Sequence, residues 1–179
     1  MAFDVQPHLT SATLELRPLT ADDFDVLYAV ARDPLIWEQH PDRERWREER
    51  FREWFKLAME QRALVAVDRT SGQVIGSSRF LEFKGDEVEI GYSFLARARW
   101  GGAWNGEMKR LMLEHAFASV RCVVFVIGPE NERSRRAVEK LGGVLRGSKE
   151  TPLGARLVYE LTPALYRRPS QPPAATVSP

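Results

Sequence analysis

A glycine-containing turn between a strand pattern and a helix pattern constrains the fold of this chain more than any other feature. Residues 88–95, before the turn, are rich in β-branched and aromatic residues, and apolar residues recur at helical spacing from Trp104 onward. The turn contains Gly101 and Gly102, which let a ligand approach the backbone closely. The first N–H groups of a helix have no intrahelical acceptor and carry partial positive charge, so this junction suits an anion such as a pyrophosphate.

The turn does not match two well-known phosphate-binding motifs. The chain has no G-x-G-x-x-G segment, and no Gly-Lys-Ser/Thr follows the turn, so neither a dinucleotide fingerprint nor a P-loop is present. Two adjacent glycines before a helix also occur in tight connections that bind nothing. The turn by itself therefore leaves two alternatives open, an anion site and a simple connection.

A second strand and helix follow directly. Residues 121–127 are a nearly continuous apolar run, which is typical of a strand buried on both faces. In the next segment Asn131 is placed to cap a helix and Gly142 to end it. Ser134 shares one face of that helix with the apolar positions. The order strand, polar turn, helix therefore occurs twice in succession.

The rest of the chain predicts further strands and two earlier helices. A helix begins at Thr20 or Asp22 and ends before Pro34, and a longer helix covers residues 42–61. Mixed charges at helical spacing on the longer helix indicate a solvated face rather than an RNA-binding one. The expected strands are residues 13–17, 63–68, 73–83, 87–95, 144–148 and 155–161.

These segments together resemble the GNAT superfamily of acyl-CoA-dependent N-acetyltransferases, and most closely its branch of ribosomal-protein alanine N-acetyltransferases. The resemblance extends over about residues 13–162, and its parts stand in the family's order. It implies an α/β fold of the α+β type, with a mixed, mostly antiparallel central sheet and helices on both faces. The sheet would be splayed between the strands at 87–95 and 121–127. The residues that carry the resemblance are 89–95, 100–107, 115–117, 131–134 and 141–143.

The resemblance implies acetyl-CoA as co-substrate. Its pantetheine arm would pair with the backbone of Ser93, Phe94 and Leu95 and contact Asn131, although a helix cap and nothing more is the alternative for Asn131. The pyrophosphate would lie on the turn formed by Trp100, Gly101, Gly102, Ala103, Trp104 and Asn105.

This turn departs from the family's usual Gln/Arg-x-x-Gly-x-Gly/Ala pattern at three positions. Trp100 stands at the Gln/Arg position, Ala103 at the central glycine and Asn105 at the final small residue. Alanine still allows close approach, and the Asn105 side chain offers a hydrogen bond to phosphate. Trp104 either stacks on the ligand or packs in the core, and the core is the favoured alternative.

The implied reaction is direct attack of an amine on the thioester. Glu89 is the expected base, acting through water, although an exposed strand residue is the alternative and Glu87 lies on the same face. Ser134 is expected to hydrogen-bond the leaving thiolate, the alternative being a helix-start serine that bonds to the backbone. Trp37 and His40 belong to a loop expected to wall the acceptor pocket.

Composition limits the remaining possibilities. The chain has 179 residues, a hydrophobic content of 44% and a formal net charge of +1, so we expect one domain over residues 1–166 and a flexible tail at 167–179. Neither nucleic acid nor a membrane is an expected partner. The N-terminus lacks a signal pattern, which favours the cytoplasm. The single cysteine excludes an internal disulfide, and no spacing of histidines and carboxylates indicates a metal site.

The sequence therefore predicts an acetyl-CoA-dependent N-acetyltransferase. Its partners would be a small-molecule or peptide amine, whose identity the variable loops do not reveal, and a second copy of the chain. The alternative is a non-catalytic CoA-binding or protein-interaction module with the same fold, motivated by the altered turn.

Overall fold

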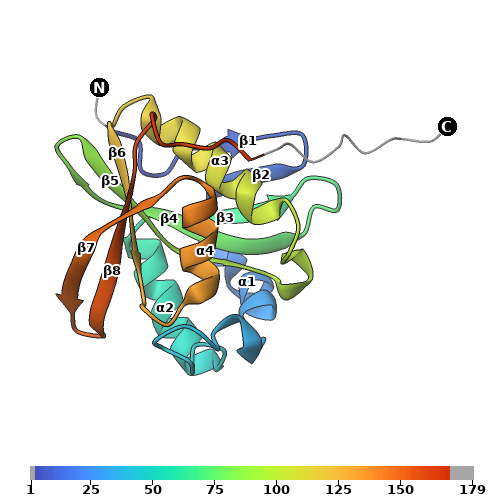
Figure 1. Cartoon of the computed structure of the whole chain (residues 1–179). Coiled ribbons are helices and arrows are strands. Elements are labelled where there is room, and N and C mark those ends of the chain that lie inside the picture. The colour runs from blue at the N-terminus through green and yellow to red at the C-terminus, as the bar shows by residue number, and fades with distance from the viewer. Residues whose placement is uncertain (1–2, 170–179) are drawn as a thin grey trace.

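The computed structural model describes residues 3–169, including all side chains in this range but that of residue 82. Its centre is an eight-stranded sheet in the order β1-β2-β3-β4-β5-β6-β8-β7 (Figure 1). Among these strands, β5 and β6 pair in parallel and the other neighbours pair antiparallel, which confirms the expected mixed, mostly antiparallel sheet. The strands are β1 Leu9–Thr10, β2 Leu14–Pro18, β3 Leu64–Asp68, β4 Val74–Lys84, β5 Glu87–Leu95, β6 Cys122–Ile127, β7 Val144–Thr151 and β8 Gly154–Leu161. The helices are α1 Phe24–Ala31, α2 Glu48–Glu60, α3 Trp104–Phe117 and α4 Glu132–Lys140, with short 3-10 turns at Ala21–Asp23, Pro34–Ile36 and Arg97–Arg99.

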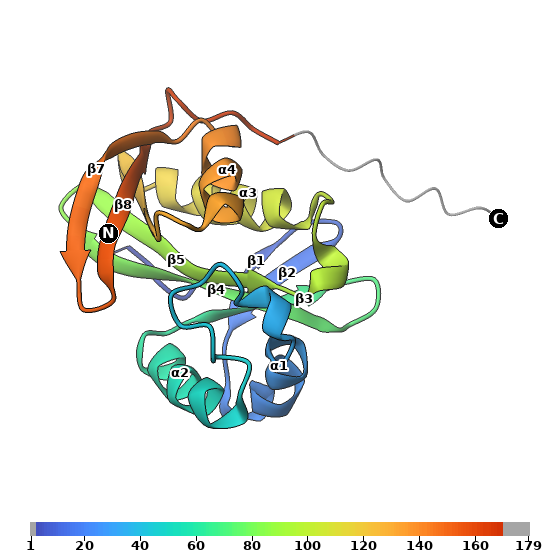
Figure 2. The ribbon, with the colours of Figure 1, turned by 60° about the horizontal axis from the view of Figure 1, so that its bottom comes forward.

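Helices cover both faces of the sheet. Figure 2 shows α1 and α2 on one face and α3 and α4 on the other. The side chains of β3 point alternately to the two faces of the sheet, as in any strand. Leu64 and Ala66 pack in the cluster beneath α3, whereas Val65 and Val67 pack in the cluster beneath α1 and α2. Each face of the sheet therefore has a hydrophobic core of its own.

The sheet opens between β5 and β6. The parallel ladder pairs residues 87–89 with 122–124 and then stops. Two residues further along β5, a bulge places Tyr92 and Ser93 opposite Ser78 of β4, and Tyr92 has a φ of +52°. A bulge of this kind bends the strand and increases its twist. The last part of β5 therefore keeps its ladder to β4 and diverges from β6, as expected from the sequence.

The chain enters its first helix at the predicted position, since the 3-10 turn Ala21–Asp23 follows Thr20 and leads directly into α1. The side chain of Asp23 accepts hydrogen bonds from the backbone N–H of Thr20 at 2.9 Å and from its hydroxyl at 3.0 Å. The guanidinium of Arg17 makes two more bonds to the same carboxylate, at 2.7 and 2.9 Å. These contacts fix the entry into the first helix.

The predicted start of the longer helix at residue 42 is wrong, because α2 begins at Glu48. Residues 42–47 form turns instead, with Arg47 in an extended conformation. The Arg45 side chain is buried in this segment, and the Trp46 carbonyl accepts a hydrogen bond from the Tyr28 hydroxyl at 3.3 Å. Such tertiary contacts override the local helical pattern.

The last described residues run along α3 and α4. The N–H of Arg167 donates to the Leu141 carbonyl at 2.8 Å, and Arg168 forms an ion pair with Glu114. Residues 170–179, most of the segment expected to be a tail, lie outside the described residues. Within residues 3–169, no helix has the length and apolar character needed to cross a membrane.

Candidate active site

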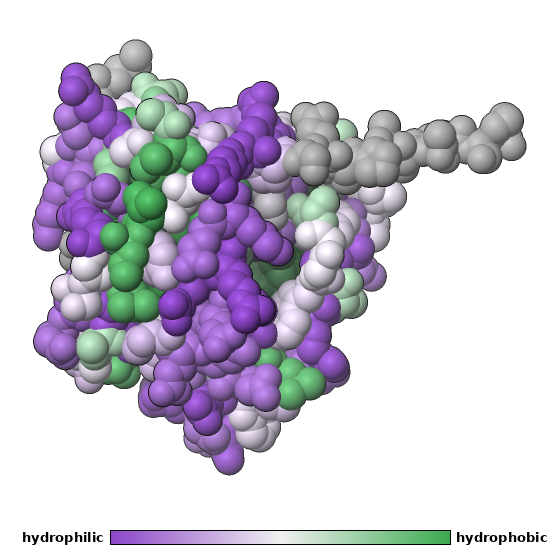
Figure 3. All heavy atoms as spheres, viewed as in Figure 1, coloured by the Kyte–Doolittle hydropathy of each residue, from purple (hydrophilic) through white to green (hydrophobic). Residues whose placement is uncertain are grey.

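One large cavity brings together nearly all of the residues singled out in the sequence. It has a volume of about 1630 Å³ and takes lining residues from both faces of the sheet. Figure 3 shows a recess between α4 and the turn that leads into α3, with hydrophobic atoms inside it and a largely hydrophilic surface around it. The predicted site residues that line the cavity are Trp37, His40, Glu89, Ser93, Phe94, Leu95, Trp100, Gly101, Gly102, Ala103, Asn105, Asn131 and Ser134.

The turn before α3 has the geometry expected of an anion site. Gly101 has a φ of +72°, and a Cβ atom added there would meet no atom within 4 Å. Ala103 occupies the N-cap position without a side-chain hydrogen bond, and the first helical bond runs from Glu107 N to Ala103 O at 2.8 Å. The first N–H groups of α3 are therefore not capped by a side chain of the turn, and this exposed end suits phosphate oxygens.

Basic side chains line the same cavity from α4 and from the segment after β8. Their positive charge complements a polyanionic ligand at the end of α3. The residues are Arg133, Arg136, Lys140, Arg167 and Arg168.

The two tryptophans of the turn have different surroundings. The indole N–H of Trp100 donates to the Leu95 carbonyl at 3.0 Å, and the Arg133 guanidinium lies 3.9 Å from its ring centroid. Trp100 therefore ties the turn to the end of β5 and stacks with α4. Trp104 does not line the cavity and packs against the core beneath α3, with Arg99 over its ring. This packing matches the core alternative for Trp104.

The free edge of β5 faces the cavity through particular backbone groups. Ala96 N donates to Ile75 O of the β4 side at 2.7 Å. Because backbone groups alternate between the two edges of a strand, those of Phe94 also face β4, whereas those of Ser93 and Leu95 face the opening toward β6. The indole of Trp100 already uses one lone pair of the Leu95 carbonyl. Ser93 and Leu95 are thus better placed than Phe94 to pair with a ligand.

Asn131 and Ser134 lie at the start of α4. The Asn131 side-chain oxygen accepts a hydrogen bond from the backbone N–H of Ser134 at 3.1 Å, so the residue does cap the helix. Both residues line the cavity, and both are half-buried. The cap leaves the amide nitrogen of Asn131 and the hydroxyl of Ser134 for other contacts.

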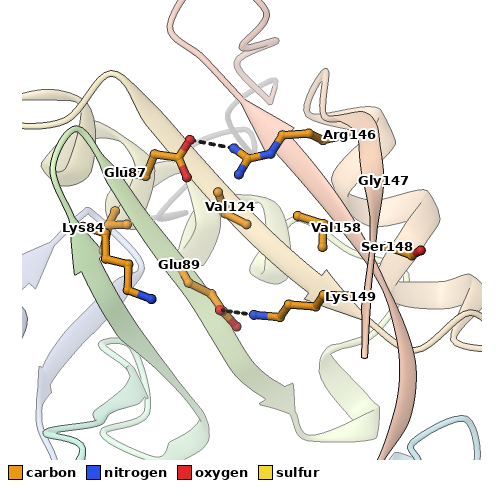
Figure 4. Close-up of a pocket in the computed structure, with 10 residues that line it drawn as sticks. Lys84, Glu87, Glu89, Val124, Arg146, Gly147, Ser148, Lys149 and Val158 are labelled. Atoms are coloured by element: carbon orange, nitrogen blue, oxygen red, sulfur yellow. Dashed lines mark hydrogen bonds and ion pairs between the residues drawn. The ribbon is translucent and has the colours of Figure 1, made fainter. Parts of the chain in front are cut away.

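The structure distinguishes the two candidate carboxylates of β5. Glu89 lines the large cavity with 15% of its side chain exposed, and its Oε2 lies 3.7 Å from the Lys149 ammonium. Glu87 does not line it, is 41% exposed and forms an ion pair with Arg146 at 2.6 Å. Figure 4 shows both carboxylates pointing to β7 across a smaller pocket of about 360 Å³. Glu89 alone of the two therefore reaches both hollows.

Trp37 and His40 lie at the opposite end of the cavity, near α2. Trp37 is buried, and its indole N–H donates to the Ala31 carbonyl at 2.7 Å. Burial, together with the nearby charge of Arg45, lowers the pKa of His40 to about 4, so the imidazole is neutral near pH 7. A neutral imidazole contributes no charge to this end of the site.

A buried lysine in the cavity was missed at the sequence level. Lys109 of α3 is 6% exposed and donates to the Ser93 hydroxyl, which in turn lies 2.7 Å from the Ser78 hydroxyl. Burial lowers the pKa of Lys109 to about 7. A signal was present in the sequence, because Lys109 stands one helical turn before Leu113 in the buried stripe of α3.

Two buried arginines were also missed. Arg79 of β4 is fully buried, and Arg45 is 6% exposed. A lone arginine in a strand or loop pattern carries no sign of burial, because its environment depends on which elements cover it. Among residues 3–169, no group of three His, Cys, Asp or Glu side chains is arranged to hold a metal ion.

The mixed sheet, its opening between β5 and β6 and the glycine-containing turn before α3 match the arrangement expected from the resemblance to acyl-group transferases. Comparison of the sequence with protein families gives the family itself. Residues 13–144 match the model of the acetyltransferase (GNAT) domain, so the chain belongs to the GNAT acetyltransferase family and is an N-acetyltransferase. The match does not distinguish the ribosomal-protein branch, which stays a prediction. No curated protein sequence matches the chain significantly.

Solved structures share the fold at low sequence identity. A GCN5-related N-acetyltransferase from Brucella melitensis has a TM-score of 0.79 at 17% identity, covering 90% of this chain and 80% of that one. Spermidine N-acetyltransferase from Vibrio cholerae, in complex with CoA and spermine, has a TM-score of 0.68 at 15% identity and covers 87% and 99%. Aminoglycoside acetyltransferase AAC(6')-Ib, in complex with coenzyme A and kanamycin, has a TM-score of 0.68 at 20% identity and covers 85% and 96%.

Proposed function

We propose that this protein transfers the acetyl group of acetyl-CoA to an amine by direct attack of the amine on the thioester. The observation that carries the proposal is the free edge of β5, where Ser93 and Leu95 present backbone groups to a cavity that ends at the uncapped turn of α3. The pantetheine arm would pair with this edge. The pyrophosphate would lie at Gly101 and Gly102, close to the basic residues of α4.

In this mechanism Glu89 accepts a proton from the attacking amine through a water molecule. An amine has an ordinary pKa near 10.4, so a base or desolvation must supply the neutral nucleophile. Glu89 and Glu87 lie on the same face of β5, but Glu89 lines the large cavity and Glu87 does not. This difference supports Glu89 as the base.

The tetrahedral intermediate requires donors for its oxyanion, and the departing thiolate requires a hydrogen bond. The N–H groups of Ser93 and Leu95 on the free edge of β5 are the candidate oxyanion donors. The hydroxyl of Ser134 would stabilise the thiolate rather than protonate it, because an alcohol is a much weaker acid than a thiol.

The acceptor would enter from the end near Trp37 and His40. Structural neighbours crystallised with spermine or kanamycin hold amine ligands, which is consistent with a small-molecule amine here. A peptide N-terminus, as the resemblance to the ribosomal-protein branch implies, belongs to the same chemical class. The cytoplasmic location and the pairing with a second copy of the chain stay predictions.

Calorimetric titration with acetyl-CoA, CoA and ATP tests the cofactor site. We expect one-to-one binding of acetyl-CoA and CoA and none of ATP, and we expect Gly101→Glu to abolish binding by placing a like charge beside the pyrophosphate. Gly72→Glu is the matched control, because Gly72 has a φ of +70°, equally open space around its Cβ and no place in the cavity. The two variants therefore carry the same backbone strain.

The outcomes separate the alternatives. Loss of binding in Gly101→Glu alone supports the site, whereas equal affinity in both variants removes the cofactor from this turn. Thiol release with a panel of amines then separates an enzyme from a CoA-binding module. If Glu89→Gln and Ser134→Ala leave every measured rate unchanged, the proposed mechanism is refuted.

A further inference from the structure

The acceptor end of the cavity contains hydrogen-bond donors that have no acceptor. Arg79 is fully buried, with its guanidinium 4.2 Å from the ring centroid of Tyr92 and 5.1 Å from that of Trp54. Its Nη1 donates to Gln61 Oε1 at 2.6 Å, but its Nε and Nη2 have no partner. Trp54, Gln61 and Tyr92, which surround this guanidinium, line the cavity. Arg79 therefore lies directly behind the cavity wall.

A second buried arginine lines the cavity itself. Arg45 is 6% exposed, its guanidinium lies 5.0 Å from the Trp37 ring centroid, and its Nε has no partner. Its Nη1 lies 3.3 Å from His40 Nε2. Arg45 is close enough to Arg79 for its charge to act on that residue, and burial together with this charge lowers the pKa of Arg79 to about 10. Two positive charges thus share one small region.

Further donors converge on the same region. Arg156 lines the cavity near His40, and its buried Nη2 has no partner. The indole nitrogen of Trp54 is also buried and unpaired. Among the described side chains, the buried polar atoms without a partner at this end of the cavity are all nitrogen donors. A buried donor without an acceptor is unfavourable, because the hydrogen bond to water that it loses on burial is not replaced.

Carboxylates at this end do not balance the arginines. Asp42 lies 3.5 Å from both Arg45 and Arg50, and Glu53 pairs with Arg50 at 2.8 Å. Arg79 has no carboxylate within ion-pair distance among the described side chains. Among the described ion pairs at this end, Asp42 and Glu53 are thus the carboxylates that accompany Arg45, Arg50, Arg79 and Arg156, while the nearby imidazole is neutral. A buried excess of positive charge is unfavourable unless a negative group joins it.

We propose that the acceptor amine carries an oxyanion, a carboxylate or a phosphate, which binds Arg45 and Arg156 while Arg79 contributes its charge from behind them. The guanidinium fork matches the geometry of either oxyanion and binds it through paired hydrogen bonds. The inference rests on the proposed function and specifies the substrate class of that site. Glu89 lines the same cavity, so the anion at this end would direct the amine of the acceptor toward the thioester.

The test uses reaction products, so it does not depend on turnover. The CoA-saturated wild-type protein is titrated with N-acetylalanine and with N-acetylalaninamide, which differ in the carboxylate. A second pair, N-acetylethanolamine phosphate and N-acetylethanolamine, tests phosphate. We expect the anionic member of at least one pair to bind at least tenfold more tightly than its neutral partner. The pair that shows the preference identifies the oxyanion.

Variants locate the preference at the arginines. Arg45→Gln should weaken binding of the preferred anion about tenfold to a hundredfold, and Arg45→Lys should restore part of it, because lysine keeps the charge but lacks the fork. Arg52→Gln is the control, since Arg52 is 63% exposed on α2 and does not line the cavity. CoA affinity should be equal in all of these proteins, which verifies that each is folded.

Absence of any anion preference in both pairs overturns the inference, as does a preference that Arg45→Gln leaves intact. Failure of CoA to bind the wild type refutes the proposed function instead. The two failures are thus distinguished by the cofactor titration that precedes the product titration.

Discussion

Replacing Lys109 by methionine should make the protein more stable, by an amount that depends on pH. Burial lowers the pKa of Lys109 from 10.5 to about 7, and no carboxylate forms an ion pair with it among the described side chains. A tenfold shift in a protonation equilibrium corresponds to about 1.4 kcal/mol. Keeping the buried amine neutral at about pH 7 therefore costs roughly 5 kcal/mol of folding free energy, and local relaxation of the structure reduces this figure.

The dependence on pH follows from the proton that the unfolded chain retains. Between pH 7 and 10.5 the unfolded lysine is protonated and the folded one is neutral, so wild-type stability rises with pH. Methionine has no such equilibrium. The advantage of Lys109→Met should be about 2–5 kcal/mol near pH 7 and should shrink by about 1.4 kcal/mol for each pH unit above it.

Urea unfolding of both proteins at three pH values near 7, 8 and 9 measures this advantage. Lys56→Met, at an exposed position of α2, is the control and should show no advantage that changes with pH. The reasoning is refuted if Lys109→Met is no more stable than wild type near pH 7, or if its advantage is the same at all three values.

Three further predictions concern catalysis and acid stability. Glu89→Gln should lower kcat by about 10²- to 10⁴-fold in steady-state assays, while Glu87→Gln should leave it unchanged; equal effects would contradict the assignment of the base. Ser134→Ala should lower kcat with little change in acetyl-CoA affinity by calorimetry, and equal losses in both would indicate a binding role. Glu107 accepts two hydrogen bonds of 2.9 Å from Arg110, which holds its pKa below the ordinary 4.5. This pair stabilises the fold above pH 4.5 and less as the carboxylate protonates, so Glu107→Gln should cost about 1–3 kcal/mol near pH 7, and the cost should vanish in acid unfolding curves.

Local signals in the sequence predict β5, the turn before α3 and the start of α4. The alternation along residues 87–95, the glycines of the turn and the cap at Asn131 each act over a few residues, and the structure keeps all three. The helical pattern at residues 42–47 is equally local, yet it is overridden because Arg45 turns inward to Trp37. Distant partners therefore decided the one helix boundary that the pattern misplaced by a turn and a half.

The charged residues of the site were harder to predict than its glycines. Arg79 lies between the buried residues Ser78 and Phe80, but an arginine in a strand usually marks a solvent-facing position. Its burial depends on α2, which is far away in sequence and supplies Trp54 above it. A local sequence pattern does not encode such a contact. The burial of Arg45 and Arg79 therefore follows only from the three-dimensional arrangement of the helices and the sheet.

The opening between β5 and β6 joins the two faces of the sheet, so the donor and the acceptor of the proposed reaction could bind on different sides of the molecule. Helices α3 and α4 lie on one face of the sheet, and α1 and α2 lie on the other (Figure 2). Trp37 packs in the cluster beneath α1 and α2, and the Arg45 guanidinium lies over its ring. An acetyl donor held from the first face leaves the second face free for the acceptor. Under the proposed function, the acetyl group would cross the sheet at the opening between β5 and β6, and each substrate would enter from its own face.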